Sequence, residues 1–255
     1  MAYQFIKFER VGGKAELTLN RPPENRLNAQ MVQEILDALE NLRDDESLKL
    51  LVLRGTNGTF CSGTETEALQ ADEVGLLMPY YTRIFKHLNK IMGLTLCIVE
   101  GNALDAGTEL AAFCDVILSS ESAVFGFPQI KMGLFPPIGT AVLPRLIGRN
   151  RTLDRIVSGE PFSAQEAFRM DLVARVVPDN KIQEVAAQYI ARINSLPAPA
   201  IILAKRAVDG ALYTPVMEAL RSTESVYMLD LMGSIDPNEG IRAALEGREP
   251  QWRNR

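Results

Sequence analysis

Two carboxylic acids stand close together at a predicted turn between a strand and a helix. The stretch NALDAGTELAAFCD (102–115) follows the apolar run 94–99 and carries Asp105 and Glu109. The first N–H groups of a helix have no partners inside it, so such a turn can bind negative charge. Apolar residues follow Glu109, and apolar surroundings raise the pKa of a carboxyl group toward the range useful for acid–base catalysis. The alternative is simpler: an acid in a first helical turn often does no more than stabilise the helix dipole.

A second turn has a similar composition. The sequence SGTE at 62–65 resembles AGTE at 106–109, and Gly63 precedes Gly107 by 44 positions. If the two turns lie side by side, one N–H from each can hold a single oxygen, which is the geometry of an oxyanion hole. A chance similarity in the three shared residues Gly-Thr-Glu is the alternative.

Other chemistry has little support in the sequence. His87, the single histidine, lies in a predicted amphipathic helix with no nucleophile turn nearby. The cysteines Cys61, Cys97 and Cys114 are odd in number and lack CxxC spacing, which predicts neither a disulfide framework nor a zinc site. Nucleotide-binding and zinc-protease motifs are absent from the sequence, so we expect no metal.

The elements that must position these residues alternate between strands and helices, which indicates an α/β fold. From Pro197 onward the pattern is helical only, which predicts a core at 1–196 and a C-terminal helical region at 197–255. The predicted strands are 15–19, 48–53, 94–99, 116–119 and 172–177. The predicted helices are 29–43, 76–92, 108–114, 140–147, 149–158, 164–170, 181–196, 198–213, 215–234 and 237–245.

Composition limits the class of protein. The chain has 255 residues, 47% of them hydrophobic, which suits one large domain or one domain with an appendage. A net charge of −5 argues against general nucleic-acid binding, because phosphate contacts need a concentrated basic face. The apolar runs are too short to span a bilayer and the N-terminus has no signal-peptide pattern. We expect a cytoplasmic protein that does not bind membranes.

Several segments resemble the crotonase superfamily, the enoyl-CoA hydratase/isomerase group. They are GTFCSGTE (58–65), the stretch from VEGNALDAGTEL to PRLIG (99–148), FSAQEAFRMDLVARVVP (162–178) and EGIRAALEGREPQW (239–252). The resemblance implies a spiral of ββα units followed by C-terminal helices that build a homotrimer or a dimer of trimers. It also implies an acyl-CoA substrate, with coenzyme A as part of the substrate and no separate cofactor.

The resemblance also implies roles for individual residues. The thioester oxygen would be held by the backbone N–H groups of Thr64 and Ala106, and Glu109 would be catalytic. The hydratases carry a second glutamate where this chain has Gln129, which cannot exchange a proton near neutral pH. Asp105 replaces a glycine of the family's turn, either as a turn former or as a second ionisable group.

The segment from Gly133 to Gly139 resembles the branch that hydrates cyclic dienoyl-CoA esters. Phe135, Pro136 and Pro137 would shape a flat pocket for a ring, and an ordinary proline-stiffened loop explains the same residues equally well. Cations are needed for the phosphates of coenzyme A. The candidates are Arg26, Lys205 and Arg206.

The leading hypothesis is therefore the hydration of an α,β-unsaturated acyl-CoA by one catalytic glutamate. Three reactions on the same fold stay open, namely isomerisation, decarboxylation and thioester hydrolysis, because each passes through an enolate or an oxyanion. A protein that binds acyl-CoA esters without turnover is a further alternative, against which the presence of Glu109 argues.

Overall fold

The strands form one large and one small sheet. In the computed structural model, which describes residues 3–254, the large sheet has six strands in the order β1-β2-β3-β4-β6-β9. The pair β1–β2 is antiparallel and the later pairs of this sheet are parallel. Its strands are β1 (Ile6–Val11), β2 (Lys14–Leu19), β3 (Leu50–Gly55), β4 (Leu94–Val99), β6 (Val116–Ser120) and β9 (Arg175–Val177).

The short strands form a second sheet, and the chain alternates between the two sheets, which gives the fold its spiral course. The strands of this small sheet are β5 (Asn102–Leu104), β7 (Val124–Gly126) and β8 (Phe162–Ser163). The chain repeatedly passes from a long strand to a short extended segment and then to a helix, as β4, β5 and the following helix illustrate. This is the ββα spiral that the resemblance to the crotonase superfamily implies.

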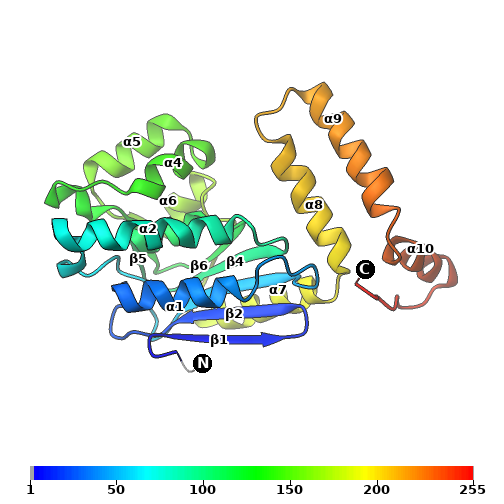
Figure 1. Cartoon of the computed structure of the whole chain (residues 1–255), viewed down its shortest axis with the longest axis horizontal. Helices are drawn as coiled ribbons and strands as arrows, with labels where there is room; N and C mark the ends of the chain where they lie inside the picture. Colours follow the sequence, from blue (N-terminus) through cyan, green and yellow to red (C-terminus); the bar gives the residue numbers. More distant parts are fainter. Residues whose placement is uncertain (1–2, 255) are drawn as a thin grey trace.

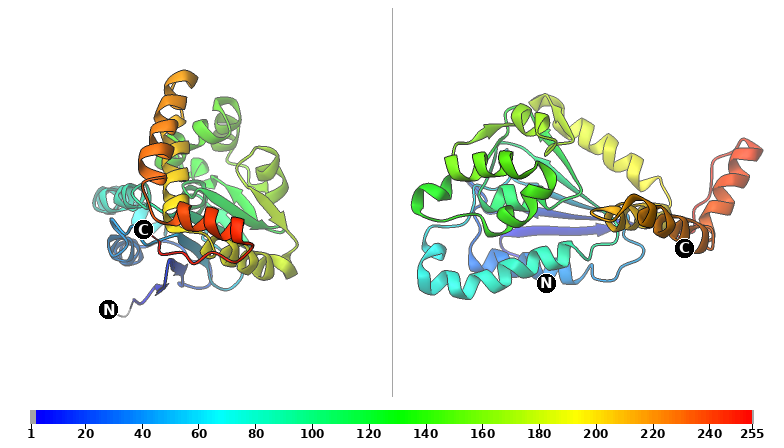
Figure 2. Two further views of the ribbon diagram at one scale, coloured as in Figure 1. Left: turned by 90° about the vertical axis from the view of Figure 1, so that its right-hand side faces the viewer. Right: turned by 90° about the horizontal axis from the view of Figure 1, so that it is seen from above.

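Helices cover both faces of the large sheet, with α1 and α2 on one face and α7 on the other (Figures 1 and 2). Parallel strands that are covered on both faces need apolar residues throughout. In β3, Leu51 and Leu53 enter the core beneath α1 and α2, while Leu50 and Val52 pack toward α7. The helices of this part are α1 (Ala29–Glu40), α2 (Ala71–Leu88), α3 (Ala106–Ala112), α4 (Pro137–Leu146), α5 (Arg149–Ser158), α6 (Ala164–Arg169) and α7 (Ile182–Asn194).

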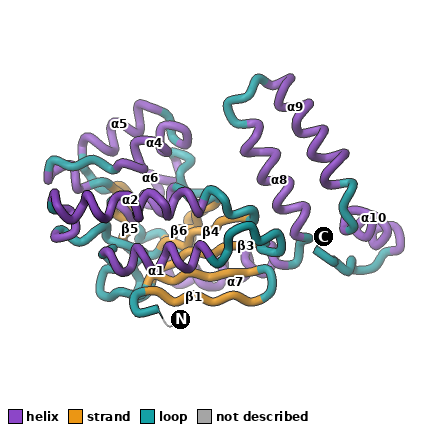
Figure 3. The backbone as a smooth tube through the Cα atoms, viewed as in Figure 1, coloured by secondary structure: helices purple, strands orange, loops and turns teal. Residues whose placement is uncertain are grey.

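The last helices project from one end of the sheet (Figures 1 and 3). They are α8 (Ala198–Ala211), α9 (Val216–Ser225), which continues into one π-helical segment at Val226–Leu231, and α10 (Asp236–Glu246). Three short 3-10 helices, η1 (Glu67–Leu69), η2 (Pro128–Met132) and η3 (Asp179–Lys181), complete the chain as described. Within residues 3–254, no helix combines the length and the apolar character needed to cross a membrane.

The structure corrects several predicted boundaries. Helix α2 begins at Ala71, five residues earlier than predicted, because Asp72 and Glu73 favour a helix N-terminus. Helix α4 begins at Pro137, which occupies the first helical position, where proline is well tolerated. The prediction missed β1, in which most residues are partly or fully exposed, and the short strands β5, β7 and β8, whose two or three residues show no period.

Candidate active site

One pairing between two chain segments brings the two turns together. Cys61, which follows β3, and Ala103 in β5 form a parallel bridge, in which Leu104 N donates to Cys61 O at 2.9 Å. Three residues after this pair, the two segments reach Thr64 and Ala106 respectively. In this register each residue of the first segment lies opposite the residue 42 positions later in the chain. SGTE and AGTE are 44 positions apart, so their matching letters do not lie at structurally equivalent positions.

Two glycines allow the turns to come this close. A Cβ at Gly107 would lie 2.1 Å from the carbonyl oxygen of Cys61, so only glycine lets α3 approach the first turn. Gly63 has φ of +93°, and a Cβ there would lie 3.2 Å from Cβ of Asp105. The side chain of Asp105 thus lies directly against the first turn.

The backbone N–H groups of Thr64 and Ala106 donate no hydrogen bond to any acceptor in residues 3–254. Ala106 is the first residue of α3, where an N–H has no partner inside the helix. The segment before α1 runs alongside the first turn, since Leu27 N donates to Gly63 O at 2.8 Å and Glu65 N donates to Leu27 O at 2.9 Å. These bonds fix the turn but leave the N–H of Thr64 available.

Glu109 lies in the first turn of α3 and is only 2% exposed. Its Oε1 accepts hydrogen bonds from the backbone N–H groups of Ile138 and Gly139, both at 2.7 Å, at the start of α4. Burial raises the pKa of Glu109 to about 7, although these bonds to its charged form act in the opposite direction. A carboxyl group with this pKa can both accept and return a proton near neutral pH.

Tyr81 is a site residue that the sequence did not predict. Its hydroxyl donates to Oε2 of Glu109 at 2.5 Å, from helix α2. Burial and the neighbouring carboxylate raise the pKa of Tyr81 well above its ordinary value, so its hydroxyl stays protonated. The available signal was a tyrosine on the apolar face of the helix that carries Leu77, Ile84 and Phe85, since a buried hydroxyl needs a partner.

Asp105 is the residue that precedes α3, with φ of 48° and ψ of −114°, a backbone conformation that residues other than glycine seldom adopt. Its Oδ1 accepts a hydrogen bond from the backbone N–H of Gln129 at 3.1 Å. Burial raises the pKa of Asp105 to about 6, while the Gln129 N–H and the charge of Arg26 lower it. The charge of Asp105 in turn raises the pKa of Glu109.

Gln129 and the proline loop flank these acids. Gln129 is 8% exposed in η2, and its side-chain amide makes no hydrogen bond with residues 3–254. Pro136 is buried, Pro137 opens α4 and is partly exposed, and Phe135 is 61% exposed. The three residues therefore differ in burial, and only Phe135 is largely exposed.

The predicted phosphate-binding cations have different surroundings. Arg26 pairs with Glu24 at 2.9 Å and lies close enough to Asp105 to lower its pKa. Lys205 donates to the carbonyl oxygens of Ile91 and Gly93 and to Asp115, at 3.2, 3.2 and 2.7 Å. These bonds use all three donors of the ammonium group, so the structure does not support a phosphate contact for Lys205. Arg206 is exposed and pairs with Asp230.

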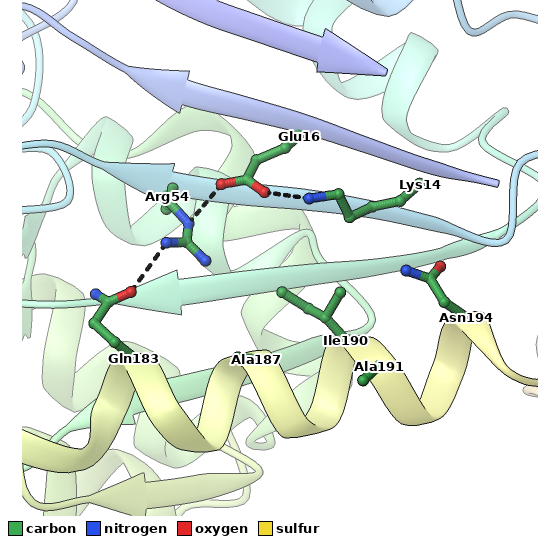
Figure 4. Close-up of a pocket in the computed structure, with 8 residues that line it drawn as sticks. All are labelled: Lys14, Glu16, Arg54, Gln183, Ala187, Ile190, Ala191 and Asn194. Atoms are coloured by element: carbon green, nitrogen blue, oxygen red, sulfur yellow. Dashed lines mark hydrogen bonds and ion pairs between the residues drawn. The ribbon is translucent and has the colours of Figure 1, made fainter. Parts of the chain in front are cut away.

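Two surface grooves lie away from these acids. The larger, about 430 Å³, runs between the sheet and α7 and is lined by Lys14, Glu16, Arg54 and Gln183 among others (Figure 4). Its polar side chains pair with one another along the groove, as Lys14–Glu16 at 2.8 Å and Arg54–Glu16 at 3.1 Å show. The smaller groove is lined by Pro144, Arg145 and Tyr213.

The arrangement combines two free backbone N–H groups with a buried acid whose pKa is near neutrality. Such donors stabilise negative charge that develops on an oxygen, and such an acid moves protons to and from carbon or water. Residues 3–254 hold no group of three or more His, Cys, Asp or Glu side chains that could bind a metal ion.

Comparison with known proteins gives a consistent family. The enoyl-CoA hydratase/isomerase family matches residues 9–255. A probable enoyl-CoA hydratase of Rhizobium meliloti is 32% identical over 258 residues, covering 100% of both chains. The 2,3-dehydroadipyl-CoA hydratase of Escherichia coli is 31% identical over 242 residues, covering 94% of both.

Solved structures share the fold. The enoyl-CoA hydratase of Bacillus anthracis superposes with a TM-score of 0.92 at 26% identity, covering 99% of this chain and 100% of that one. An enoyl-CoA hydratase subunit of Geobacillus kaustophilus superposes with a TM-score of 0.89 at 32% identity, covering 99% of both. The spiral of ββα units, the paired turns and these full-length similarities lead to one conclusion: the chain belongs to the enoyl-CoA hydratase/isomerase family, the crotonase superfamily, and is an enzyme of that group.

Proposed function

We propose that this enzyme adds water to the double bond of an α,β-unsaturated acyl-CoA thioester. The observation that carries the proposal is the combination, on one helix, of a free N–H at Ala106 and a buried carboxyl at Glu109 three residues later. With the N–H of Thr64 this provides two donors for the thioester oxygen and one group for the proton. The names of the relatives in Rhizobium meliloti and Escherichia coli agree with this reaction.

The reaction balances with one acid. The Glu109 carboxylate takes a proton from water while the water oxygen bonds to the β-carbon. The electron pair of the double bond moves to the thioester oxygen, where the N–H groups of Thr64 and Ala106 stabilise the resulting enolate. Glu109 then gives its proton to the α-carbon, the carbonyl re-forms, and the net change is one added water.

Gln129 and Asp105 have supporting roles in the proposal. The Gln129 amide orients the attacking water, since its oxygen accepts and its nitrogen donates hydrogen bonds without exchanging protons. Asp105 shapes the turn in front of α3 and, through its charge, raises the pKa of Glu109. It is also the only other carboxyl group within the described site that could share the proton transfer.

The same site supports a second reaction, isomerisation of the double bond. The observation that favours it is Gln129, because moving a proton from one carbon to another requires one acid and no activated water. Decarboxylation and thioester hydrolysis use the same oxyanion donors. Binding without turnover is the alternative from outside catalysis.

For the acyl group we propose a cyclic dienoyl ester as one candidate, supported by the rigid pair Pro136 and Pro137 at the start of α4. Linear enoyl esters are the other candidate, and the Escherichia coli relative is named for a linear one. We further propose a homotrimer, or a dimer of trimers, acting in the cytoplasm, with Arg26 as a contact for the coenzyme A phosphates. The proposed reaction uses no cofactor, because coenzyme A belongs to the substrate.

The test is incubation of the purified enzyme with linear enoyl-, cyclic dienoyl- and malonyl-type CoA esters, followed by mass spectrometry. Hydration adds the mass of one water, isomerisation leaves the mass unchanged, decarboxylation removes carbon dioxide, and hydrolysis releases free coenzyme A. Hydration of one ester class supports the proposal and identifies the acyl group. Tight binding with no mass change in any ester would reject it.

A further inference from the structure

We propose that Tyr81 is a positioning residue that makes Oε2 of Glu109 the oxygen that exchanges the reacting proton. The inference rests on the proposed function, in which Glu109 carries that proton. It concerns a residue of helix α2, far in sequence from the two turns, whose hydroxyl donates to Glu109.

The hydrogen bonds of Glu109 distinguish its two oxygens. Each carboxylate oxygen can accept about two hydrogen bonds. Oε1 accepts two, from the N–H groups of Ile138 and Gly139, so its capacity is filled. Oε2 accepts one, from the Tyr81 hydroxyl. The one remaining acceptor position of this carboxylate is therefore on Oε2, next to the tyrosine.

The ring of Tyr81 is held in place by packing. It is 6% exposed and meets Phe85 edge-on, with ring centroids 5.0 Å apart at 81°. Phe85 in turn packs against Phe113, the residue that ends α3, at 5.1 Å. This row of rings connects α2 to the helix that carries Glu109, so packing holds the Tyr81 hydroxyl beside Oε2.

The bond favours the charged form of Glu109. A hydroxyl that donates to a carboxylate stabilises the ionised state and lowers its pKa, against the burial that raises it. The other titratable groups that act on this pair are Asp105 and the thiol of Cys61, and both raise the pKa of Tyr81. The first turn of α4 contributes backbone N–H groups and no charged side chain. Tyr81 is therefore the one side-chain donor in the described site that counteracts the rise in the pKa of Glu109 caused by burial.

The experiment compares Tyr81→Phe with Tyr80→Phe, a matched control on the same helix whose side chain is 40% exposed. The first measurement is a pH titration of the Glu109 carboxyl by infrared difference spectroscopy, with Glu109→Gln as the reference. The second is the pH profile of kcat/KM. For Tyr81→Phe we expect both to move to higher pH by about one unit, because a hydrogen bond to a charged group is lost. We expect kcat to fall about tenfold with KM little changed. Tyr80→Phe should behave as wild type.

Two further variants keep the test decisive. Fluorotyrosine at position 81 keeps the ring and makes the hydroxyl a stronger donor, so it should move the Glu109 titration to lower pH even if Tyr81→Phe folds poorly. In a Glu109→Gln background, Tyr81→Phe should cause no additional loss of kcat. An unchanged Glu109 titration in a folded Tyr81→Phe protein, or in the fluorotyrosine protein, would overturn the inference.

Failure of the inference and failure of the proposed function give different results. The infrared titration needs no substrate. If the titration shifts but no ester is turned over, the hydratase proposal is contradicted and the hydrogen bond of Tyr81 to Oε2 is supported. Normal turnover with an unshifted titration contradicts the positioning role and keeps the proposed function.

Discussion

Cys61 and Ala103 lie opposite each other in a parallel bridge, and this pairing brings together the two segments that carry the N–H groups of Thr64 and Ala106. The residues that pair are apolar and buried, while the groups that they align are backbone atoms three positions further on. The proposed oxyanion donors therefore depend on strand register and on the two glycines, Gly63 and Gly107, that allow the close approach.

The first prediction removes one of these donors. Replacing residue 106 by lactic acid exchanges its N–H for an ester oxygen and should lower kcat/KM about 100- to 1,000-fold. The control is the same replacement at Ala71, which is likewise the first residue of a helix. Equal rates for the two ester proteins would contradict the role of the Ala106 N–H.

The second prediction concerns the acid itself. Glu109→Gln keeps the size of the side chain and removes its proton, so turnover should fall at least 100-fold while binding of a CoA ester changes little. Rates from single-turnover kinetics and affinity from calorimetry separate the two effects. Glu121→Gln, an exposed substitution in a turn, is the matched control. Turnover within about tenfold of wild type would remove Glu109 from the mechanism.

The third prediction follows from the pKa of Glu109, raised from 4.5 to about 7. Between these values the unfolded chain has lost the proton and the folded chain still holds it, so the free energy of unfolding falls as pH rises. The stability contribution is complete below about pH 4.5 and lost above pH 7. Across this window the stability of wild type relative to Glu109→Gln should fall by about 3 kcal/mol. Denaturant unfolding at several pH values measures it, and a pH-independent difference would contradict the raised pKa.

The sequence predicted much of the fold because apolar strands and amphipathic helices have clear periods. It also indicated apolar surroundings for Glu109, which is buried, and the family resemblance implied that the turns around Gly63 and Gly107 lie together, as the Cys61–Ala103 bridge shows. It could not give the contact between Tyr81 and Glu109, because these residues are 28 positions apart and nothing local encodes their approach. For the same reason Lys205 looked like a surface cation, whereas tertiary contacts occupy its donors.

The fourth prediction separates the two roles of Asp105. Asp105→Asn keeps an oxygen for the Gln129 N–H and tolerates positive φ, so kcat should stay within about tenfold of wild type if Asp105 only shapes the turn. Removing its charge should move the acidic limb of the pH profile to lower pH, because that charge raises the pKa of Glu109. Gln129→Glu adds a charge and should move the limb the other way. A loss above 100-fold in Asp105→Asn would mean that Asp105 shares the proton transfer.

The fifth prediction contrasts two cations. Lys205→Met removes three hydrogen bonds and leaves Asp115 without its cation, which should lower the free energy of unfolding by about 1–3 kcal/mol and leave KM for the CoA ester unchanged. Arg26→Gln should raise KM and leave stability nearly unchanged, since Arg26 is a partly exposed residue paired at the surface. A raised KM in Lys205→Met together with lowered stability in Arg26→Gln would contradict this assignment of roles.

The contact of Glu109 with the N–H groups of Ile138 and Gly139 means that the proposed acid also closes the first turn of α4. A negative charge at a helix N-terminus binds more tightly than a neutral group. Each time Glu109 takes up a proton, the attachment of α4 weakens, and each time it releases the proton the attachment recovers. The segment that carries Pro136 and Pro137 is thus coupled to the protonation state of Glu109. Its mobility should rise when Glu109 is protonated and fall when Glu109 is ionised, once in each turnover.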